Sequence, residues 1–174
     1  MNISEQLLTP NEYSRPGTLL QGVKGIVIHY TGNPGASAQG NRNYFDSLKN
    51  QPPDSSGIYA SAHYVVGLEG EIIRCLPDTE IGYHVGARQY TPEALQRLSS
   101  YPNDCTIGIE LCIDKTGSFN TAVLASGQEL ARMLRETYGL NRDDLWRHYD
   151  ITGKICPKPF VDNLHAWEDF KASC

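Results

Sequence analysis

Short apolar runs separated by glycine, proline and polar residues recur along this chain. Residues 23–30 (Val-Lys-Gly-Ile-Val-Ile-His-Tyr) are mostly apolar and β-branched, which predicts a buried strand. Residues 62–68 and 71–75 flank Glu69-Gly70, and this arrangement predicts a β-hairpin. A further apolar run over residues 106–113 predicts another strand.

Helical spacing is clearest over residues 121–138, and Gly139 is placed to end that helix. Weaker signals predict three more helices, over residues 38–49, from Thr91-Pro92 onward, and over residues 161–171. Proline and turn signals predict irregular chain in two segments, residues 1–22 and residues 51–57. Because no repeat or linker interrupts the pattern, we expect a single α/β domain over residues 1–174, with a mixed central β-sheet flanked by helices.

The composition excludes several classes of function. The 174 residues, 40% hydrophobic and 20% charged, suit one globular domain with a sizeable core. The formal net charge is -5 and no dense cluster of Lys and Arg occurs, so we expect no binding to nucleic acid. No apolar run approaches the ~20 residues that a membrane-spanning helix needs, so we expect no membrane insertion.

The first residues and the cysteines indicate where the protein is made. Residues 1–6 lack a charged region followed by an apolar region, so no signal peptide is visible and we expect synthesis in the cytoplasm. The five cysteines include no Cys-x-x-Cys pair. A disulfide framework is therefore not expected, and most of these cysteines are interpreted as buried thiols.

His29 and His148 differ from the other histidines in their positions. His29 lies at the C-terminal end of the strand predicted over residues 23–30, just before a Gly-rich loop, which is where α/β sheets build their sites. His148 is followed eight residues later by Cys156, a spacing that is not specific by itself. Two imidazoles and one thiolate are good zinc ligands, and three protein ligands leave a fourth position open for catalysis.

Two charged residues suggest catalytic roles. Glu110 interrupts the apolar run over residues 106–113, on a strand face that it shares with Gly108 and Cys112. An edge strand with one solvated face is an alternative interpretation, but a small and weakly polar face is typical of the floor of a cleft. Burial in such a cleft would suit Glu110 as a general base. Lys154 lies two residues before Cys156, where it would stabilise negative charge that develops in a reaction.

Four motifs, taken in order, resemble those of a known family. They are Val27-Ile-His29-Tyr-Thr31, Ser61-Ala-His63-Tyr-Val-Val, Ile107-Gly-Ile-Glu110-Leu, and Arg147-His148 followed by Lys154-Ile-Cys156-Pro157. Together they resemble the type 2 N-acetylmuramoyl-L-alanine amidases, which include phage endolysins, Bacillus-type autolysins and the animal peptidoglycan recognition proteins. The resemblance covers nearly the whole chain, from about Asn11 to about Trp167, and four ordered motifs are far more specific than any one of them.

The resemblance implies an activity and a cofactor. It implies a zinc-dependent hydrolase that cleaves the amide bond between N-acetylmuramic acid and L-alanine in bacterial peptidoglycan. It also implies that His29, His148 and Cys156 bind the zinc ion. Glu110 matches the carboxylate that activates water in many bacterial members, and Lys154 matches the lysine that polarises the scissile carbonyl.

The chain departs from one pattern within this family. Some phage and animal members place a catalytic tyrosine immediately before the His63 position, whereas this chain has Ala62 there. The chain is therefore similar to the members that use a glutamate, and His63 is interpreted as a packing residue. By the same resemblance we expect His84 to line the substrate cleft, with Thr31 and Asn33 as further candidate substrate contacts.

The charge and the resemblance together suggest how the protein works. The missing signal peptide favours a phage or prophage endolysin, released to the wall by a membrane-permeabilising partner, over a host autolysin. A net charge of -5 gives no attraction to anionic wall polymers. We therefore expect the natural polypeptide to continue into a C-terminal wall-binding domain that this chain does not include. We expect the chain to be monomeric.

Three alternative classes stay open from the sequence. A non-catalytic peptidoglycan-binding module would lack one of the zinc ligands. A structural zinc domain would supply a fourth protein ligand that closes the site. A metal-independent cysteine hydrolase, with Cys156 as nucleophile and His148 as base, would keep its activity in the presence of chelators.

Overall fold

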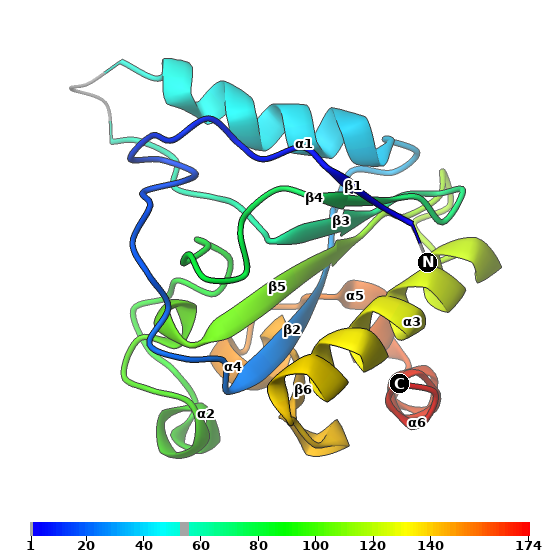
Figure 1. Ribbon diagram of the computed structural model, residues 1–174. Helices are drawn as coiled ribbons and strands as arrows, with labels where there is room; N and C mark the ends of the chain where they lie inside the picture. Colours follow the sequence, from blue (N-terminus) through cyan, green and yellow to red (C-terminus); the bar gives the residue numbers. More distant parts are fainter. Residues whose placement is uncertain (1, 53–55) are drawn as a thin grey trace.

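The computed structural model describes residues 2–52 and 56–174 (Figure 1). Its strands are β1 (Ile3–Glu5), β2 (Gly25–Tyr30), β3 (Tyr64–Val66), β4 (Ile72–Arg74), β5 (Thr106–Leu111) and β6 (Leu145–Arg147). Its α-helices are α1 (Ala38–Ser47), α2 (Pro92–Arg97), α3 (Thr121–Tyr138), α4 (His148–Thr152), α5 (Lys158–Asp162) and α6 (Leu164–Ala172). Short 3-10 helices occupy Leu48–Asn50, Pro102–Asp104 and Arg142–Asp144. The loop predicted over residues 51–57 lies partly outside the described residues.

The strands form one mixed sheet of six strands in the order β1-β4-β3-β5-β2-β6. Strands β3 and β4 are antiparallel, as the predicted hairpin requires, and the other neighbouring pairs are parallel. The prediction of an α/β domain with a mixed central sheet is therefore confirmed. Because β2 is parallel to both β5 and β6, the carboxyl ends of these three strands lie at the same edge of the sheet.

Helices α3 and α6 cover one face of the sheet (Figure 1). Alternate residues of β2 and β5 point into this layer, and Ile28 and Ile109 are fully buried there. The side chain of Asn120 accepts a hydrogen bond from the Val123 N–H at the start of α3, and Gly139 ends the helix in the left-handed conformation. The helix predicted over residues 121–138 is thus confirmed.

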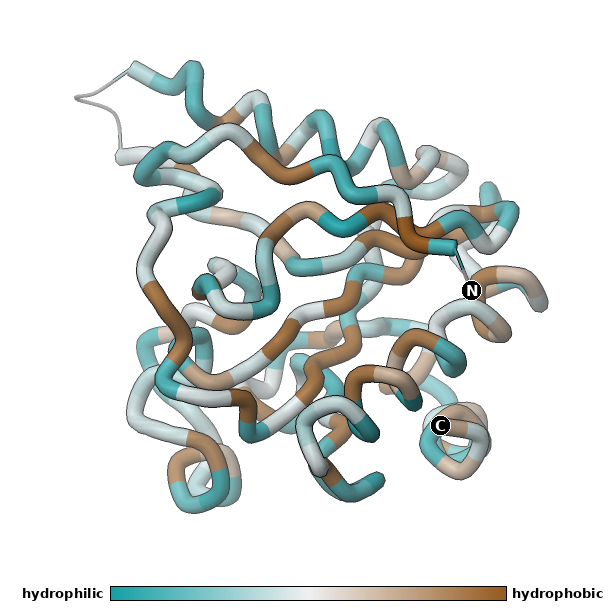
Figure 2. Tube along the Cα trace, in the orientation of Figure 1, coloured by the Kyte–Doolittle hydropathy of each residue, from teal (hydrophilic) through white to brown (hydrophobic). Residues whose placement is uncertain are grey.

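The opposite face carries two smaller apolar clusters. One lies beneath α1, where Phe45 joins Val65. The other lies beside α2 and α4, around Val27 and Trp146. Figure 2 shows hydrophobic residues concentrated along the strands, whereas the outer turns of α1 are mostly hydrophilic. A cavity lined by His29 and Glu110 opens at the carboxyl ends of β2 and β5.

The structure corrects three expectations about the elements. Residues 1–22 are not entirely irregular, because β1 pairs with β4 as an edge strand of the sheet over three residues, too few for a periodic signal. The helix predicted over residues 161–171 is split into α5 and α6. The split falls at Asn163, whose side chain accepts a hydrogen bond from the Ala166 N–H and caps α6. Strand β6 was not predicted, since three residues before a helix carry no alternation.

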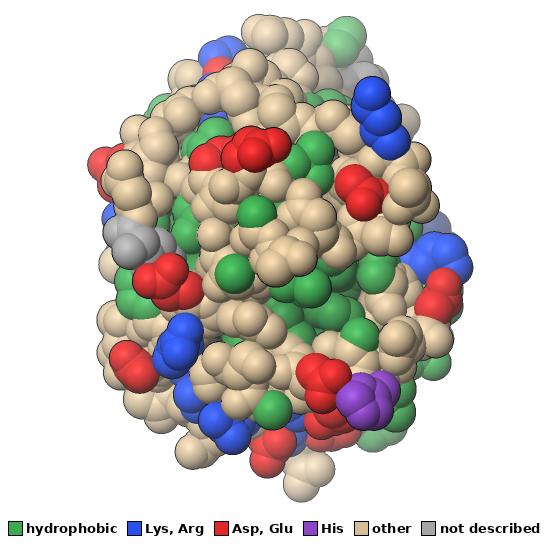
Figure 3. Space-filling model, turned by 90° about the vertical axis from the view of Figure 1, so that its right-hand side faces the viewer, with side chains coloured by type: hydrophobic (Ala, Val, Ile, Leu, Met, Phe, Trp, Pro, Cys, Tyr) green, Lys and Arg blue, Asp and Glu red, His purple; other side chains and the backbone are tan. Residues whose placement is uncertain are grey.

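Surface features of the described residues agree with the composition. None of their helices combines the length and the apolar character that a membrane span requires. The face shown in Figure 3 carries acidic and basic side chains around an apolar centre. This face therefore presents no electrostatic field of one sign.

Candidate active site

Three neighbouring parallel strands bring the predicted site residues together. His29 near the end of β2 lies in register with Glu110 on β5. On the other side of β2, Ile28 is in register with Arg147, the residue that precedes His148. The three side chains thus lie at the carboxyl edge of the sheet, where α/β folds commonly place their ligands.

His29, His148 and Cys156 form a buried cluster. The Nδ1 atom of His29 lies 3.2 Å from Nδ1 of His148 and 3.6 Å from Sγ of Cys156. The three candidate ligand atoms all lie within 4.8 Å of one another. Tetrahedral zinc, with bonds of about 2.0–2.1 Å to nitrogen and about 2.3 Å to sulfur, places two nitrogens about 3.3 Å apart and nitrogen about 3.6 Å from sulfur. Both the spacing and the donor types therefore fit a zinc ion.

A tight turn after α4 returns Cys156 to His148. Gly153 ends α4 in the left-handed conformation, with φ of 79°. The Tyr149 N–H then donates to the Cys156 carbonyl at 2.8 Å. At the start of α4, Arg147 forms an ion pair with Asp150 at 2.6 Å. The turn places the cysteine side chain beside the imidazole that begins the helix.

Burial sets the charge states in this cluster. Loss of hydration, with smaller contributions from neighbouring positive groups, lowers the pKa of His29 well below its usual value and that of His148 to about 4. Both imidazoles are therefore neutral at pH 7 and have a lone pair for a metal. Burial raises the pKa of the Cys156 thiol to about 12. A bound cation reverses this effect, because it favours the thiolate.

Glu110 lies on the floor of the same cavity. Its side chain is partly exposed to the cavity, but Oε2 is buried and has no hydrogen-bond partner among the described residues. Desolvation raises the pKa of Glu110 to about 8, and the charge of Lys154 opposes this shift. A carboxyl group that titrates near neutral pH, next to metal-binding donors, suits proton transfer in catalysis.

The cavity has a volume of about 720 Å³ and includes most of the predicted site residues. His29, His148, Cys156, Glu110, Lys154, Thr31 and His84 all line it. Thr31 resembles Glu110 in having a buried oxygen, Oγ1, without a partner among the described residues. Asn33 is exposed and does not line the cavity, so its role as a substrate contact stays a prediction.

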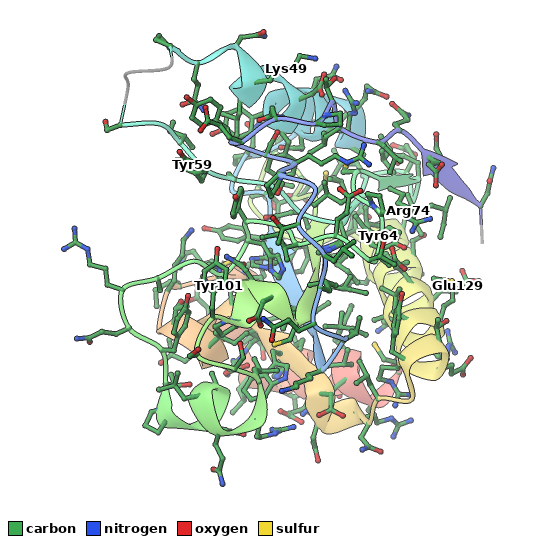
Figure 4. The ribbon with its side chains drawn as sticks, turned by 60° about the vertical axis from the view of Figure 1, so that its left-hand side comes forward. Lys49, Tyr59, Tyr64, Arg74, Tyr101 and Glu129 are labelled. Atoms are coloured by element: carbon green, nitrogen blue, oxygen red, sulfur yellow. The ribbon has the colours of Figure 1, made fainter. Side chains whose placement is uncertain are left out.

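Two tyrosines at the rim, Tyr59 and Tyr101, were not predicted. Tyr59 and Tyr101 line the cavity with 52% and 38% of their surface exposed, and Figure 4 shows them on two separate segments, Tyr59 above Tyr101. Asn103, which also lines the cavity, accepts hydrogen bonds from the His84 and Val85 N–H groups. All three residues lie in loops or a short 3-10 helix, where a single sequence offers only a richness in tyrosine as a signal.

Comparison with known proteins gives consistent matches. A family model described as N-acetylmuramoyl-L-alanine amidase matches residues 19–159. The N-acetylmuramoyl-L-alanine amidase BlyA of Bacillus subtilis (strain 168) is 39% identical over 168 residues, which cover 92% of this chain and 43% of BlyA. A probable N-acetylmuramoyl-L-alanine amidase of Bacillus licheniformis is 41% identical over 161 residues, covering 92% of this chain and 44% of that protein. The chain thus spans less than half the length of these relatives.

A solved structure extends the likeness to the fold. The mutant endolysin from Bacillus subtilis superposes with a TM-score of 0.74 at 28% identity. The superposition covers 99% of this chain and 97% of the endolysin chain. The fold described above is therefore shared along the whole chain.

Proposed function

This chain belongs to the N-acetylmuramoyl-L-alanine amidase family, and on that basis we propose that it hydrolyses the amide bond between N-acetylmuramic acid and L-alanine in bacterial peptidoglycan. The observation that carries the proposal is the cluster of His29, His148 and Cys156 beside Glu110 in one cavity. A non-catalytic binding module needs no such combination. Because the chain spans less than half of its relatives, the proposal concerns the reaction of this domain.

We infer that the three clustered side chains hold one zinc ion. When bound, zinc supplies Lewis acidity, which polarises the substrate carbonyl and lowers the pKa of water. His29 and His148 offer neutral nitrogen donors, and all three residues are buried apart from the side that lines the cavity. Three protein ligands leave a position open, and no fourth His, Cys, Asp or Glu joins this group among the described residues. This favours a catalytic site over a structural one.

Glu110 is the proposed general base. Its pKa is about 8 in the metal-free site, and a cation bound nearby would lower it, so that the carboxylate could accept a proton from the attacking water and later release it to the departing amine. The unpartnered Oε2 gives the carboxylate a free acceptor inside the cavity. Lys154 lines the same cavity and is close enough to lower the pKa of Glu110's carboxyl and of both histidines. We assign it to stabilising the negative charge that develops on the scissile carbonyl oxygen.

The biological setting proposed here is that of a phage or prophage endolysin, made in the cytoplasm and acting on the wall after release. The similarity to the mutant endolysin from Bacillus subtilis supports this setting. A host autolysin is the alternative. The similarity to amidases of two Bacillus species supports the same reaction in either setting.

Digestion of purified peptidoglycan with and without a chelator tests the reaction. By mass spectrometry we expect released peptides that begin with L-alanine, and glycan strands that have lost their peptides but are not cut. The chelator should stop the release of both products, and added zinc should restore it. Products cut within the glycan or within the peptide would contradict the proposed bond. Activity that survives the chelator would favour a cysteine hydrolase, and binding without products would favour a recognition module.

A further inference from the structure

His84 contacts a proposed zinc ligand directly, from the side that faces away from the metal position. The Nδ1 atom of His84 lies 3.1 Å from Nε2 of His29. The two rings meet edge to face, with an interplanar angle of 88°. His29 uses its other nitrogen, Nδ1, toward His148 and Cys156. His84 therefore contacts the nitrogen of His29 that cannot bind the metal.

The hydrogen bonds of His84 determine which of its ring nitrogens carries the proton. Its Nε2 atom lies 3.3 Å from the Thr106 carbonyl oxygen. A carbonyl only accepts hydrogen bonds, so His84 donates from Nε2 and has a lone pair on Nδ1. The Thr106 hydroxyl also lies 3.3 Å from Nε2, but this hydroxyl already donates to the Pro102 carbonyl at 2.7 Å and can itself accept. Both partners are thus acceptors for the same N–H group.

The tautomer of His84 in turn determines the tautomer of His29. Since His84 presents a lone pair, the contact between the two rings forms a hydrogen bond only when His29 carries its proton on Nε2. A neutral imidazole protonated on Nε2 has its free lone pair on Nδ1, which is the nitrogen that faces His148 and Cys156. The chain from Thr106 through His84 thereby selects the metal-binding tautomer of His29.

The backbone around His84 is shaped to hold the ring in this place. A Cβ atom at Gly108 would lie 2.7 Å from Cγ of His84, so only glycine lets the ring lie this close to β5. Asn103 accepts hydrogen bonds from the N–H groups of His84 and Val85 at 3.1 and 2.9 Å. The backbone of His84 is thus held by Asn103 and its ring lies against Gly108, and the residue is only 8% exposed.

We propose that His84 is a positioning residue that fixes the ring orientation and the tautomer of His29 for zinc binding. The proposal rests on the proposed zinc site of His29, His148 and Cys156, but not on the identity of the bond that is hydrolysed. It differs from the substrate contact expected from the sequence, because both ring nitrogens of His84 are already bonded within the protein.

Nitrogen NMR of the histidine side chains in the native, metal-free protein is the first test. Long-range proton–nitrogen correlations distinguish the two neutral tautomers of each ring. We expect both His29 and His84 to carry the proton on Nε2. A His29 proton found on Nδ1 overturns the proposal, and this readout needs no substitution that could disturb folding.

Zinc affinity of matched variants is the second test. His84→Leu removes the acceptor for His29, and we expect the zinc dissociation constant, measured by chelator competition, to rise about 10–100-fold. His84→Asn places an amide oxygen near the position of Nδ1, so we expect it to recover most of this loss. His63→Leu is the control, because His63 is also a buried imidazole beside His84, and among the described residues its ring nitrogens bond to backbone, the Gly108 N–H and the Glu80 carbonyl.

The outcomes separate this inference from the proposed function. If His84→Leu binds zinc as tightly as the native protein, or if His63→Leu weakens zinc equally, His84 has no positioning role. If His29→Ala binds zinc normally, the metal site itself is wrong. If the zinc results hold but peptidoglycan is not cleaved, the proposed reaction fails while the role of His84 stands.

Discussion

The two faces of the central sheet are built from the same strands for different purposes. On β2, Ile28 points to one face and His29 to the other, and on β5 Ile109 and Glu110 alternate in the same way. The face beneath α3 and α6 is filled with apolar side chains. The opposite face holds neutral imidazoles, a thiol and a carboxyl with an unpartnered oxygen.

The difference teaches which residues stabilise the fold and which carry the chemistry. Burying an apolar side chain contributes about 1.5–3 kcal/mol to stability. Burying a polar atom without a partner costs about 1–3 kcal/mol instead. The site face is therefore kept at the expense of stability, and the apolar face offsets that cost. Changes on the two faces should accordingly separate activity from stability.

Loss of a metal ligand should have the largest effect. Cys156→Ala removes the thiolate from the three-donor cluster, so we expect loss of stoichiometric zinc and a fall in hydrolysis of about 10³-fold or more, since Lewis-acid stabilisation is worth several kcal/mol. Metal analysis and the rate of release of muropeptide fragments measure both. A variant that keeps its zinc and its rate would remove Cys156 from the site.

Glu110→Gln should separate chemistry from metal binding. The substitution keeps the shape of the side chain but removes the base, and general-base catalysis is worth about 10²–10⁴-fold. We expect turnover to fall by that factor, with about one zinc per chain retained and the fold unchanged by circular dichroism. A near-native rate would show that another group activates the water.

Ile109→Ala tests the other face of the same strand. Ile109 is fully buried against the layer formed by α3 and α6, so its truncation leaves a cavity and should cost about 2–5 kcal/mol of unfolding free energy. Urea unfolding measures this loss. We expect the rate per folded molecule to stay close to native at low temperature. A large fall in that rate would mean that the two faces are not independent.

Lys154→Ala should give a smaller loss, confined to the reaction step. Removing one donor to a developing oxyanion costs about 10²–10³-fold in kcat. We expect this loss in kcat, with KM and zinc content little changed, because Lys154 is exposed at the cavity and is not one of the clustered donors. A change in KM alone would assign Lys154 to substrate binding.

The sequence predicted the elements, and the strand face on which Glu110 lies, better than it predicted contacts between distant segments. The 3.6-residue spacing over residues 121–138 and the N-cap position of Thr91 specify helices locally, and both agree with the structure. The alternation around Glu110 likewise placed its side chain opposite the isoleucines. Such signals arise from neighbours in sequence, so one chain is enough to see them.

Contacts between distant segments gave no such signal. Strand β1 depends on its pairing with β4, about which three residues say nothing. His84 lies 55 positions from His29, and only the packed sheet brings the two rings together. Tyr59 and Tyr101 reach the cavity from separate loops. These features depend on tertiary packing, which periodicity does not encode.

The pH dependence of stability offers the finest comparison between the faces. In the metal-free protein the pKa of Glu110 is about 8, compared with 4.5 for an unburied glutamate. Below about pH 4.5 the carboxyl is protonated in both the folded and the unfolded state, so it makes no difference to stability. Between these two pKa values unfolding releases a proton, so the native protein loses stability as pH rises, and the loss levels off above about pH 8.

Glu110→Gln removes this titration and should therefore be more stable than the native protein at high pH. The pKa difference sets a limit of about 4 kcal/mol between pH 5 and pH 9. We expect about 2 kcal/mol, because the side chain partly meets solvent in the cavity and is less desolvated than a fully enclosed group. Urea unfolding of both proteins with a chelator present, at pH 5 and at pH 9, measures the change. Ile109→Ala is the control, since its stability deficit should not vary with pH. Equal pH profiles for the native protein and Glu110→Gln would show that Glu110 titrates normally, and the contrast between the two faces would then rest on the metal cluster alone.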